Sequence, residues 1–139
     1  MEAEAHDRMD IRLPEIQAKL LKEVSRVNSN IVLVLMHGGI VAMDDATIQL
    51  AKSIVSLGYP GRYAGEVVPE VLYGLREAAW GKLTVTWYKS SMMEELDMVD
   101  FDMIRPPGRT YRYYSGVPHF HFGCKWCIPL SYEFLVLAA

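Results

Sequence analysis

The sequence predicts an α/β fold, because segments with helical periodicity alternate with short apolar segments that are typical of buried strands. The clearest helical segment runs from residue 13 to 27, and the clearest strand follows it at 31–36. A weaker repeat of helix and strand follows between 47 and 57. The chain has 139 residues, of which 51% are hydrophobic, so it is long enough to build one domain around one core.

The first helix is predicted from apolar residues that recur on one helical face while charged residues fall elsewhere. Pro14 suits a first helical turn, and the Asn-Ser-Asn sequence at 28–30 ends the pattern. The apolar positions are Leu13, Ile16, Leu20, Leu21, Val24 and Val27.

Residues 31–36 predict a strand buried on both faces, because they are apolar without alternation and end abruptly at His-Gly-Gly. A helix at 47–53, a strand at 54–57 and a turn at 58–61 follow. A further helix is expected within 64–73. Its interior Pro69 would cost about 3 kcal/mol, so we expect this helix to begin near Val68.

The second half of the chain is less regular. Residues 83–88 alternate in the manner of a strand, and 111–114 and 130–137 are two further candidate strands. Between them, 89–110 is predicted to be a long loop, and a loop of that length inside a domain is usually functional or disordered.

Composition narrows the possible partners. The net charge is −3 with both signs interspersed, which argues against nucleic acid or an anionic membrane surface and favours a small or neutral partner. The longest aliphatic run, 31–36, is far shorter than the ~18 residues of a membrane span, and the charged start lacks a signal-peptide core. No membrane segment or export route is therefore expected from the residues.

A dense ionisable cluster opens the chain: Glu2, Glu4, His6, Asp7 and Arg8. Such a cluster is ordinarily a solvated chain end. It could also form one wall of a sugar-cleaving site, where a carboxylic acid protonates the leaving oxygen.

Cys124 and Cys127, with His119 and His121 nearby, raise a zinc or redox alternative. Their spacing is too compressed for a usual zinc finger, and no second cysteine pair is present. We expect no metal and no cofactor.

Several motifs occur in a characteristic order. Together they resemble the second, α/β-sandwich domain of glycoside hydrolase family 3, of the plant β-xylosidase and α-arabinofuranosidase type. The motifs are Glu-Ala-Glu-Ala-His-Asp-Arg at 2–8, Leu-Pro at 13–14, the 31–39 strand and glycines, Gly-Tyr-Pro-Gly at 58–61, Thr-Trp-Tyr at 86–88, Pro-Gly-Arg-Thr-Tyr-Arg-Tyr-Tyr-Ser-Gly at 107–116, Phe-Gly at 122–123 and Leu-Ser-Tyr at 130–132.

The resemblance covers residues 1–139 and implies a three-layer α/β/α sandwich with a mostly parallel sheet. It also implies a retaining exo-β-glycosidase acting on an oligosaccharide or aryl glycoside, outside the cell or in the cell wall. In this family a (β/α)₈ barrel supplies an Asp nucleophile, and this domain supplies the general acid/base. The family pattern places that role on Glu4, with Glu2 less well placed, and gives Asp7, Arg8 and Arg109 supporting positions.

This chain also departs from the family pattern. Residues 124–129 read as an insertion, and the family's barrel and the strand leading to Glu4 have no counterpart before position 1. We therefore expect a sheet incomplete at its N-terminal edge, self-association through that edge, and no activity without a barrel. The alternative is a non-catalytic carbohydrate-binding or interaction module.

Aromatic and basic residues in the motifs leave two readings open. The aromatic residues could stack on sugars, but core packing is expected for Trp87 and Tyr113. Arg109 and Arg112 could bind a carboxylate or sugar hydroxyls, although a structural ion pair holding the long loop is favoured. The aromatic set is Tyr59, Trp87, Tyr88, Tyr111, Tyr113 and Tyr114.

Overall fold

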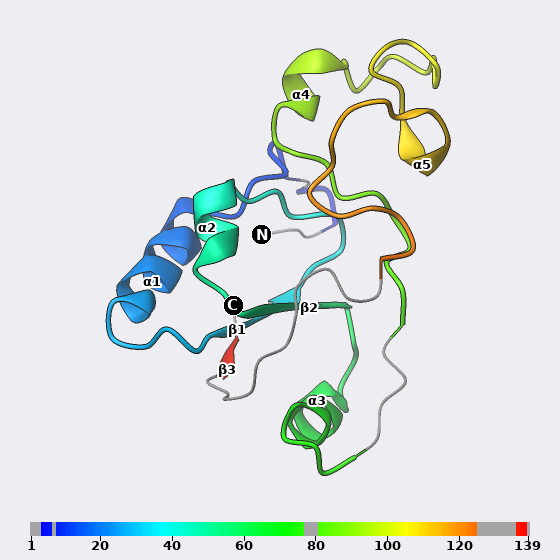
Figure 1. Cartoon of the computed structure of the whole chain (residues 1–139). Coiled ribbons are helices and arrows are strands. Elements are labelled where there is room, and N and C mark those ends of the chain that lie inside the picture. Colours follow the sequence, from blue (N-terminus) through cyan, green and yellow to red (C-terminus); the bar gives the residue numbers. More distant parts are fainter. Residues whose placement is uncertain (1–3, 7, 77–80, 125–135, 139) are drawn as a thin grey trace. The chain divides into compact units, whose positions relative to one another are not determined.

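The computed structural model describes residues 4–6, 8–76, 81–124 and 136–138 (Figure 1). The chain divides into two compact units. We call the first the loop unit, which comprises Met1–Leu13, Ile40–Asp44 and Lys82–Cys127. The second, the sheet unit, comprises Pro14–Gly39, Asp45–Gly81 and Ile128–Ala139.

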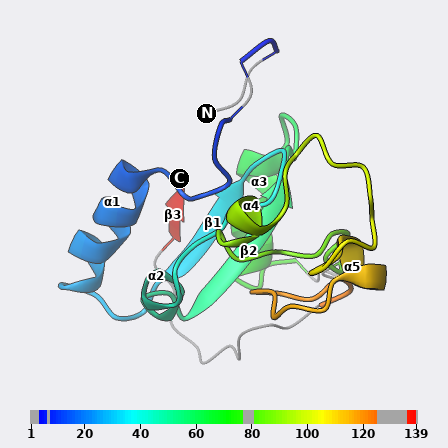
Figure 2. The same ribbon diagram turned by 90° about the horizontal axis from the view of Figure 1, so that it is seen from above.

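A parallel sheet forms the centre of the sheet unit. Strand β1 (Val32–Met36) lies between β2 (Ser53–Gly58) and β3 (Val136–Ala138), and both pairings are parallel. Figure 2 shows β1 and β2 running side by side. Residues 32–35 are all buried, which confirms the strand predicted from the unbroken apolar run.

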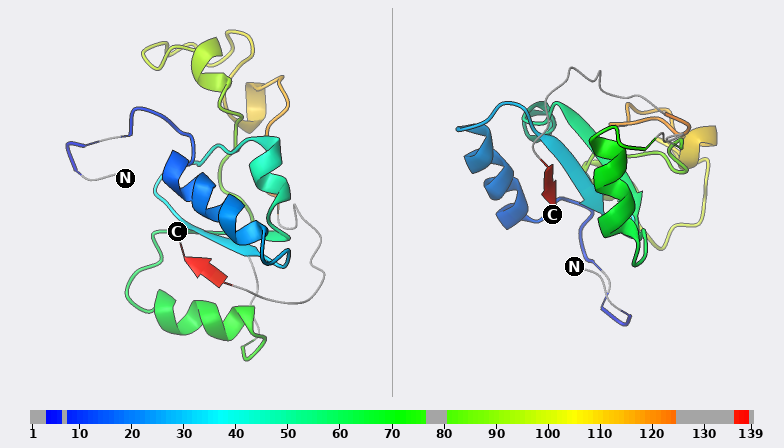
Figure 3. Two further views of the ribbon diagram at one scale, coloured as in Figure 1. Left: turned by 90° about the vertical axis from the view of Figure 1, so that its left-hand side faces the viewer. Right: turned by 90° about the horizontal axis from the view of Figure 1, so that it is seen from below.

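Helices cover both faces of this sheet. Helices α1 (Glu15–Ser25) and α2 (Asp45–Gln49) lie on one side, and α3 (Ala64–Leu72) lies on the other (Figures 1 and 3). This arrangement confirms the α/β fold class with a parallel sheet between helical layers. Within the described ranges, no helix combines the length and apolar character needed to cross a bilayer.

A cluster of buried apolar side chains lies between β1 and α3. Val32 and Val34 are alternate residues of β1, so their side chains share one face of the sheet, and they cluster with Leu72 of α3. All three are at most 6% exposed. The partly buried Val55, Leu57 and Val68 pack around them.

The apolar face of α1 is only partly buried. The predicted helix is confirmed, but of its apolar residues only Leu21 is buried, and Ile16 and Leu20 are 73% and 52% exposed. The 3.6-residue period identified the helix correctly. It did not show how much of the stripe other parts of the chain would cover, because coverage depends on packing rather than on periodicity.

Several boundaries differ from those predicted, most of all the end of α2 and the start of α3. Helix α2 ends before residue 50 rather than at 53, because the backbone N–H groups of Lys52 and Ser53 already donate to the carbonyl of Ile31, beside β1. Helix α3 begins at Ala64, so the expected start near Val68 is wrong.

Pro69 is accommodated inside α3. The helix is initiated upstream by the Tyr63 carbonyl, which accepts hydrogen bonds from Glu66 N–H at 3.1 Å and Val67 N–H at 3.0 Å. Pro69 has no N–H to offer the carbonyl of Gly65, one helical turn earlier. Both residues lie on the exposed side of the helix, where water can satisfy that carbonyl.

The loop unit contains less regular structure than its sequence pattern predicts. Residues 83–88 form no strand: bends at 84 and 85 interrupt the pairing, and a single antiparallel bridge joins Trp87 to Phe120. Residues 89–110 form the predicted long loop, apart from the short helix α4 (Met92–Glu95).

The predicted strand at 111–114 is also wrong, because Thr110–Tyr113 form the helical turn α5. Thr110 has a φ of 61°, and its N–H donates to the Tyr88 hydroxyl, which turns the chain away from an extended path. Of the predicted strand at 130–137, residues 136 and 137 belong to β3, and 130–135 lie outside the described residues.

Candidate functional site

Glu4, the candidate acid/base, lies exposed in a turn of the loop unit. The next residue, Ala5, has a φ of 63°. This left-handed conformation costs an L-residue roughly 1–2 kcal/mol, and such strain occurs preferentially at functional sites. His6 follows, also exposed, whereas Glu2 and Asp7 lie outside the described residues.

Arg8 anchors the chain just after this turn. Its side chain is part-buried, and its guanidinium donates a hydrogen bond of 3.0 Å to the carbonyl of Ile40. A cation satisfying a partly buried carbonyl makes a stronger bond than a neutral donor would. This contact holds the chain at Arg8, four residues after Glu4.

Backbone hydrogen bonds hold the chain shortly after Arg8 as well. Ala42 donates to the carbonyl of Ile11 at 2.7 Å and accepts from the N–H of Leu13 at 2.8 Å, as part of a parallel bridge to Arg12. Ala42 is 2% exposed, and its neighbours Val41 and Met43 are also buried. The turn at Glu4 thus precedes a segment, 11–13, whose backbone is hydrogen-bonded to the buried residue Ala42.

Arg109 holds the long loop, as favoured from the sequence, but the contact differs from the predicted ion pair. Its guanidinium donates to the backbone carbonyls of Asp97 at 2.6 Å and Asp100 at 2.9 Å. The ion pair in this loop is instead formed by Arg105 and Asp100, at 2.7 Å. Arg112 lies over the ring of Tyr113, 5.6 Å from its centroid.

The aromatic residues divide differently from the prediction. Trp87 is 2% exposed and meets the edge of Phe120 at a centroid distance of 5.7 Å, which confirms its core role. Tyr113 is 43% exposed, so the core role expected for it is wrong. Tyr59 is also largely exposed.

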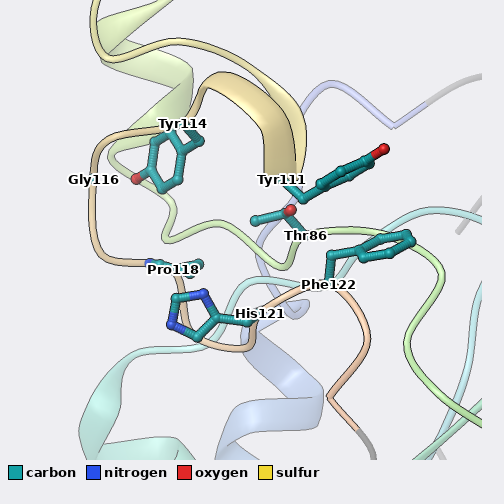
Figure 4. A pocket seen from close by; sticks show the side chains of 7 residues that line it. All are labelled: Thr86, Tyr111, Tyr114, Gly116, Pro118, His121 and Phe122. Carbon is teal, nitrogen blue, oxygen red and sulfur yellow. The ribbon is translucent and has the colours of Figure 1, made fainter.

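A cavity of about 280 Å³ lies within the loop unit (Figure 4). One side carries the rings of Tyr111 and Phe122, which stack with centroids 4.4 Å apart and planes inclined by 26°. The hydroxyl oxygen of Thr86 is buried and has no hydrogen-bond partner among the described residues. The cavity is lined by Thr86, Tyr111, Tyr114, Gly116, Pro118, His121 and Phe122.

Tyr114 forms the opposite side of this cavity. Burial raises the pKa of its phenol above the usual 10.0, and the nearby Glu95 carboxylate and Tyr88 raise it further. The hydroxyl therefore stays protonated at neutral pH and can donate a hydrogen bond. Gly116 lies close beside it, so a Cβ added at this position would require the Tyr114 ring to shift.

The cysteine motif offers no metal site in the described part of the chain. No group of three or more His, Cys, Asp or Glu residues is placed there to hold a metal ion. Cys124 is disulfide-bonded, and Cys127 lies outside the described residues.

Sequence reasoning missed most of the cavity. The alternating pattern at 83–88 predicts no site role for Thr86, whereas this residue is 6% exposed and lines the cavity. His121 had been considered only as a zinc ligand, and Phe122 only as part of a motif. The available signal was that five of the seven cavity residues, all but Pro118 and His121, fall in three of the family-like segments, at 86–88, 107–116 and 122–123.

Comparison with known proteins identifies the class. Residues 1–126 match the glycosyl hydrolase family 3 C-terminal domain. The chain belongs to glycoside hydrolase family 3, as the motif order predicted, and corresponds to the C-terminal domain of that family.

The similar proteins within this family are xylosidases. β-Xylosidase/α-L-arabinofuranosidase 2 of Medicago sativa subsp. varia is 38% identical over 133 residues, which cover 88% of this chain and 17% of that protein. A probable exo-1,4-β-xylosidase xlnD of Aspergillus fumigatus is 35% identical and likewise covers 88% of this chain. The chain therefore spans about a sixth of the length of these relatives.

A solved structure shows the same fold. It is a family 3 exo-β-xylosidase, XlnD, in complex with a xylobiose aziridine activity-based probe. This chain superposes on it with a TM-score of 0.79 and 29% sequence identity, over 91% of this chain and 17% of that one. The match confirms the α/β fold predicted for this domain.

Proposed function

We propose that this chain serves as the acid/base-bearing domain of a β-xylosidase-like enzyme, which hydrolyses O-glycosyl bonds in xylan-derived oligosaccharides. The observation that carries the proposal is the position of Glu4, which is exposed on a left-handed turn and followed by the Arg8 anchor. A proton donor must reach a substrate oxygen outside its own domain, and an exposed carboxyl on an anchored turn suits that task.

The chemistry requires a second carboxylate. In a retaining mechanism this second carboxylate lies about 5 Å from the first and attacks the anomeric carbon, while the first carboxylic acid protonates the leaving oxygen. Glu4 then removes a proton from the water that releases the sugar. The nucleophile would come from a barrel domain of the kind known in this family, so we expect this chain alone to show no turnover.

A domain exchange tests the proposal directly. Residues 1–139 would replace the matching segment of the Aspergillus fumigatus relative, and the hybrid would be assayed with aryl β-xylosides. Glu4→Gln should lower kcat by about 10²–10⁴-fold for a poor leaving group, because protonation is then essential. With a dinitrophenyl leaving group the first step needs little protonation, so that step should be affected far less.

Two further variants in the same hybrid serve as controls for Glu4→Gln. Glu66→Gln, an exposed carboxylate in the first turn of α3, should leave turnover unchanged. Glu2→Gln tests the neighbouring candidate. If Glu2→Gln shows the leaving-group dependence and Glu4→Gln does not, the role of Glu4 is refuted.

The proposal places the enzyme in xylan breakdown outside the cell or in the cell wall, with neutral oligosaccharides as substrates. The names of the similar proteins support the substrate class. A non-catalytic carbohydrate-binding role is the alternative, and the stacked Tyr111 and Phe122 rings favour it. Xylobiose binding by an exchange hybrid without turnover would support that alternative.

A further inference from the structure

We infer that the cavity of the loop unit is a second, non-hydrolytic sugar site that takes one neutral pyranose ring. It is formed wholly by residues of 86–122 and includes none of the residues assigned to proton transfer. The inference therefore does not depend on the proposed hydrolysis, and binding can be measured without turnover.

The cavity's chemistry selects the class of ligand. Its lining contains no lysine, arginine or carboxylate, so it carries no permanently charged side chain for ion pairing with a charged ligand. A volume of about 280 Å³ lies just below the ~300–1,000 Å³ of sites for drug-sized ligands, and suits a single sugar ring.

The stacked rings supply an apolar platform. Tyr111 and Phe122 are 66% and 46% exposed, so their mutual stacking leaves ring surface open to a ligand. The axial C–H groups of a pyranose form an apolar face that packs on such rings, while its hydroxyls point outward to polar partners. Tyr114 and His121 contribute a phenol and an imidazole for those hydroxyls.

Thr86 is the second, independent indication. A buried hydroxyl without a partner costs about 1–3 kcal/mol, and native structures keep few of them. The Thr86 oxygen is such a group, and the residue lines the cavity among the side chains shown in Figure 4. A ligand hydroxyl can reach it when an exposed rim ring turns aside, which is a picosecond-to-nanosecond motion for exposed side chains.

The test is a titration of the full 139-residue chain with methyl β-xyloside, followed by NMR chemical shifts. Saturable shifts should map to residues 86 and 111–122, with a dissociation constant on the order of millimolar for so small a ligand. Phenol at the same concentrations distinguishes sugar binding from general affinity for rings, and should shift these residues less.

Variants separate a binding role from a packing role. Thr86→Val keeps the side-chain shape and removes the hydroxyl, and should weaken sugar binding about fivefold while leaving the melting temperature unchanged or higher. Tyr111→Ala, on the exposed rim, should weaken binding by a similar factor. Tyr59→Ala, an exposed aromatic of the sheet unit, should leave binding unchanged.

Glu4→Gln should also bind methyl β-xyloside normally, which distinguishes failure of this site from failure of the hydrolytic proposal. Shifts that do not saturate would overturn the inference. It would also be overturned if Thr86→Val and Tyr111→Ala both bound the sugar as tightly as the parent chain, or if phenol bound more tightly than the sugar.

Discussion

At the scale of single residues, the loop unit contains two glycines in the left-handed conformation that favours glycine. Gly108 has a φ of 85°, and a Cβ added there would lie 2.2 Å from the carbonyl oxygen of Tyr113. Gly123 has a similar φ of 78°, but a Cβ there would meet nothing within 4 Å. A side chain at Gly123 would meet backbone strain alone, whereas one at Gly108 would meet both strain and a steric clash.

Gly108→Ala should therefore destabilise the chain more than Gly123→Ala. The second change costs only the left-handed strain of roughly 1–2 kcal/mol, whereas the first must also displace the α5 backbone. Urea unfolding of both variants measures the difference. Equal losses of unfolding free energy would show that the close approach at Gly108 relaxes without cost.

The raised pKa of Tyr114 predicts a pH dependence. Its pKa is higher folded than unfolded, so the folded chain retains this proton as the unfolded chain begins to lose it near pH 10. The stabilisation is complete below pH 10 and is lost as pH rises through the folded pKa. Melting temperatures of the parent chain should thus fall more steeply above pH 10 than those of Tyr114→Phe, and parallel curves would contradict this.

For single residues, burial was predicted correctly where the size and apolar character of the side chain determine it. Trp87 is large and apolar and is buried, as expected. Tyr113 is exposed and residues 83–88 form no strand, because the helical turn α5 and the bends at 84 and 85 change the direction of successive side chains. Nothing in the alternating pattern signals those turns.

At the scale of elements, the sheet unit was predictable and the loop unit was not. The α1 pattern is strongly periodic, and the unbroken apolar run of β1 ends abruptly at His-Gly-Gly, so each pattern indicates its element type. The segments at 83–88 and 111–114 are short, and their backbone follows side-chain contacts, such as the one between Thr110 and Tyr88. Those contacts join residues far apart in sequence, which local propensity does not register.

Leu72 should be the more costly of two nearby leucines to truncate. It is 6% exposed in the core cluster, so Leu72→Ala should lower the free energy of unfolding by about 2–5 kcal/mol. Leu75 is 79% exposed, and Leu75→Ala should change that free energy by less than about 0.5 kcal/mol. Chemical denaturation distinguishes them, and a similar cost for both would show that the β1–α3 contact contributes little.

Pro69→Ala should stabilise α3. The alanine restores an N–H for the Gly65 carbonyl and removes the ring, in a helix interior where proline is about 3 kcal/mol less favourable than alanine. Because this face is exposed and already hydrated, we expect a gain of about 1 kcal/mol in unfolding free energy. A loss on thermal unfolding would mean that the proline itself packs usefully.

At the scale of the whole molecule, motif order revealed more than any single motif. The family was predictable because its segments recur in sequence order, and the profile match over residues 1–126 confirms it. The proposed hydrolytic site is only partly predictable from this chain: the family motif gives Glu4 as the candidate acid/base, but a glycosidase needs a second carboxylate, and this chain spans about a sixth of the length of its relatives.

The isolated chain should self-associate. A sheet edge was expected to drive this, and the structure adds the exposed apolar residues of α1, Ile16 and Leu20. Light scattering should show a mass that rises with concentration. Ile16→Glu should lower that mass if the α1 face contributes, whereas an unchanged mass would leave the sheet edge as the interface, and a monomer at all concentrations would contradict the expectation.

The pairing of β3 with β1 has a consequence for synthesis of the protein. The central strand at 32–36 has one neighbour at 53–58 and the other at 136–138. The three-stranded sheet can therefore be completed only after residues about a hundred positions further along the chain have been translated. While the chain emerges from the ribosome, one side of β1 stays without the partner it has in the finished fold. Removal of residues 136–138 would leave that side without its β3 partner permanently.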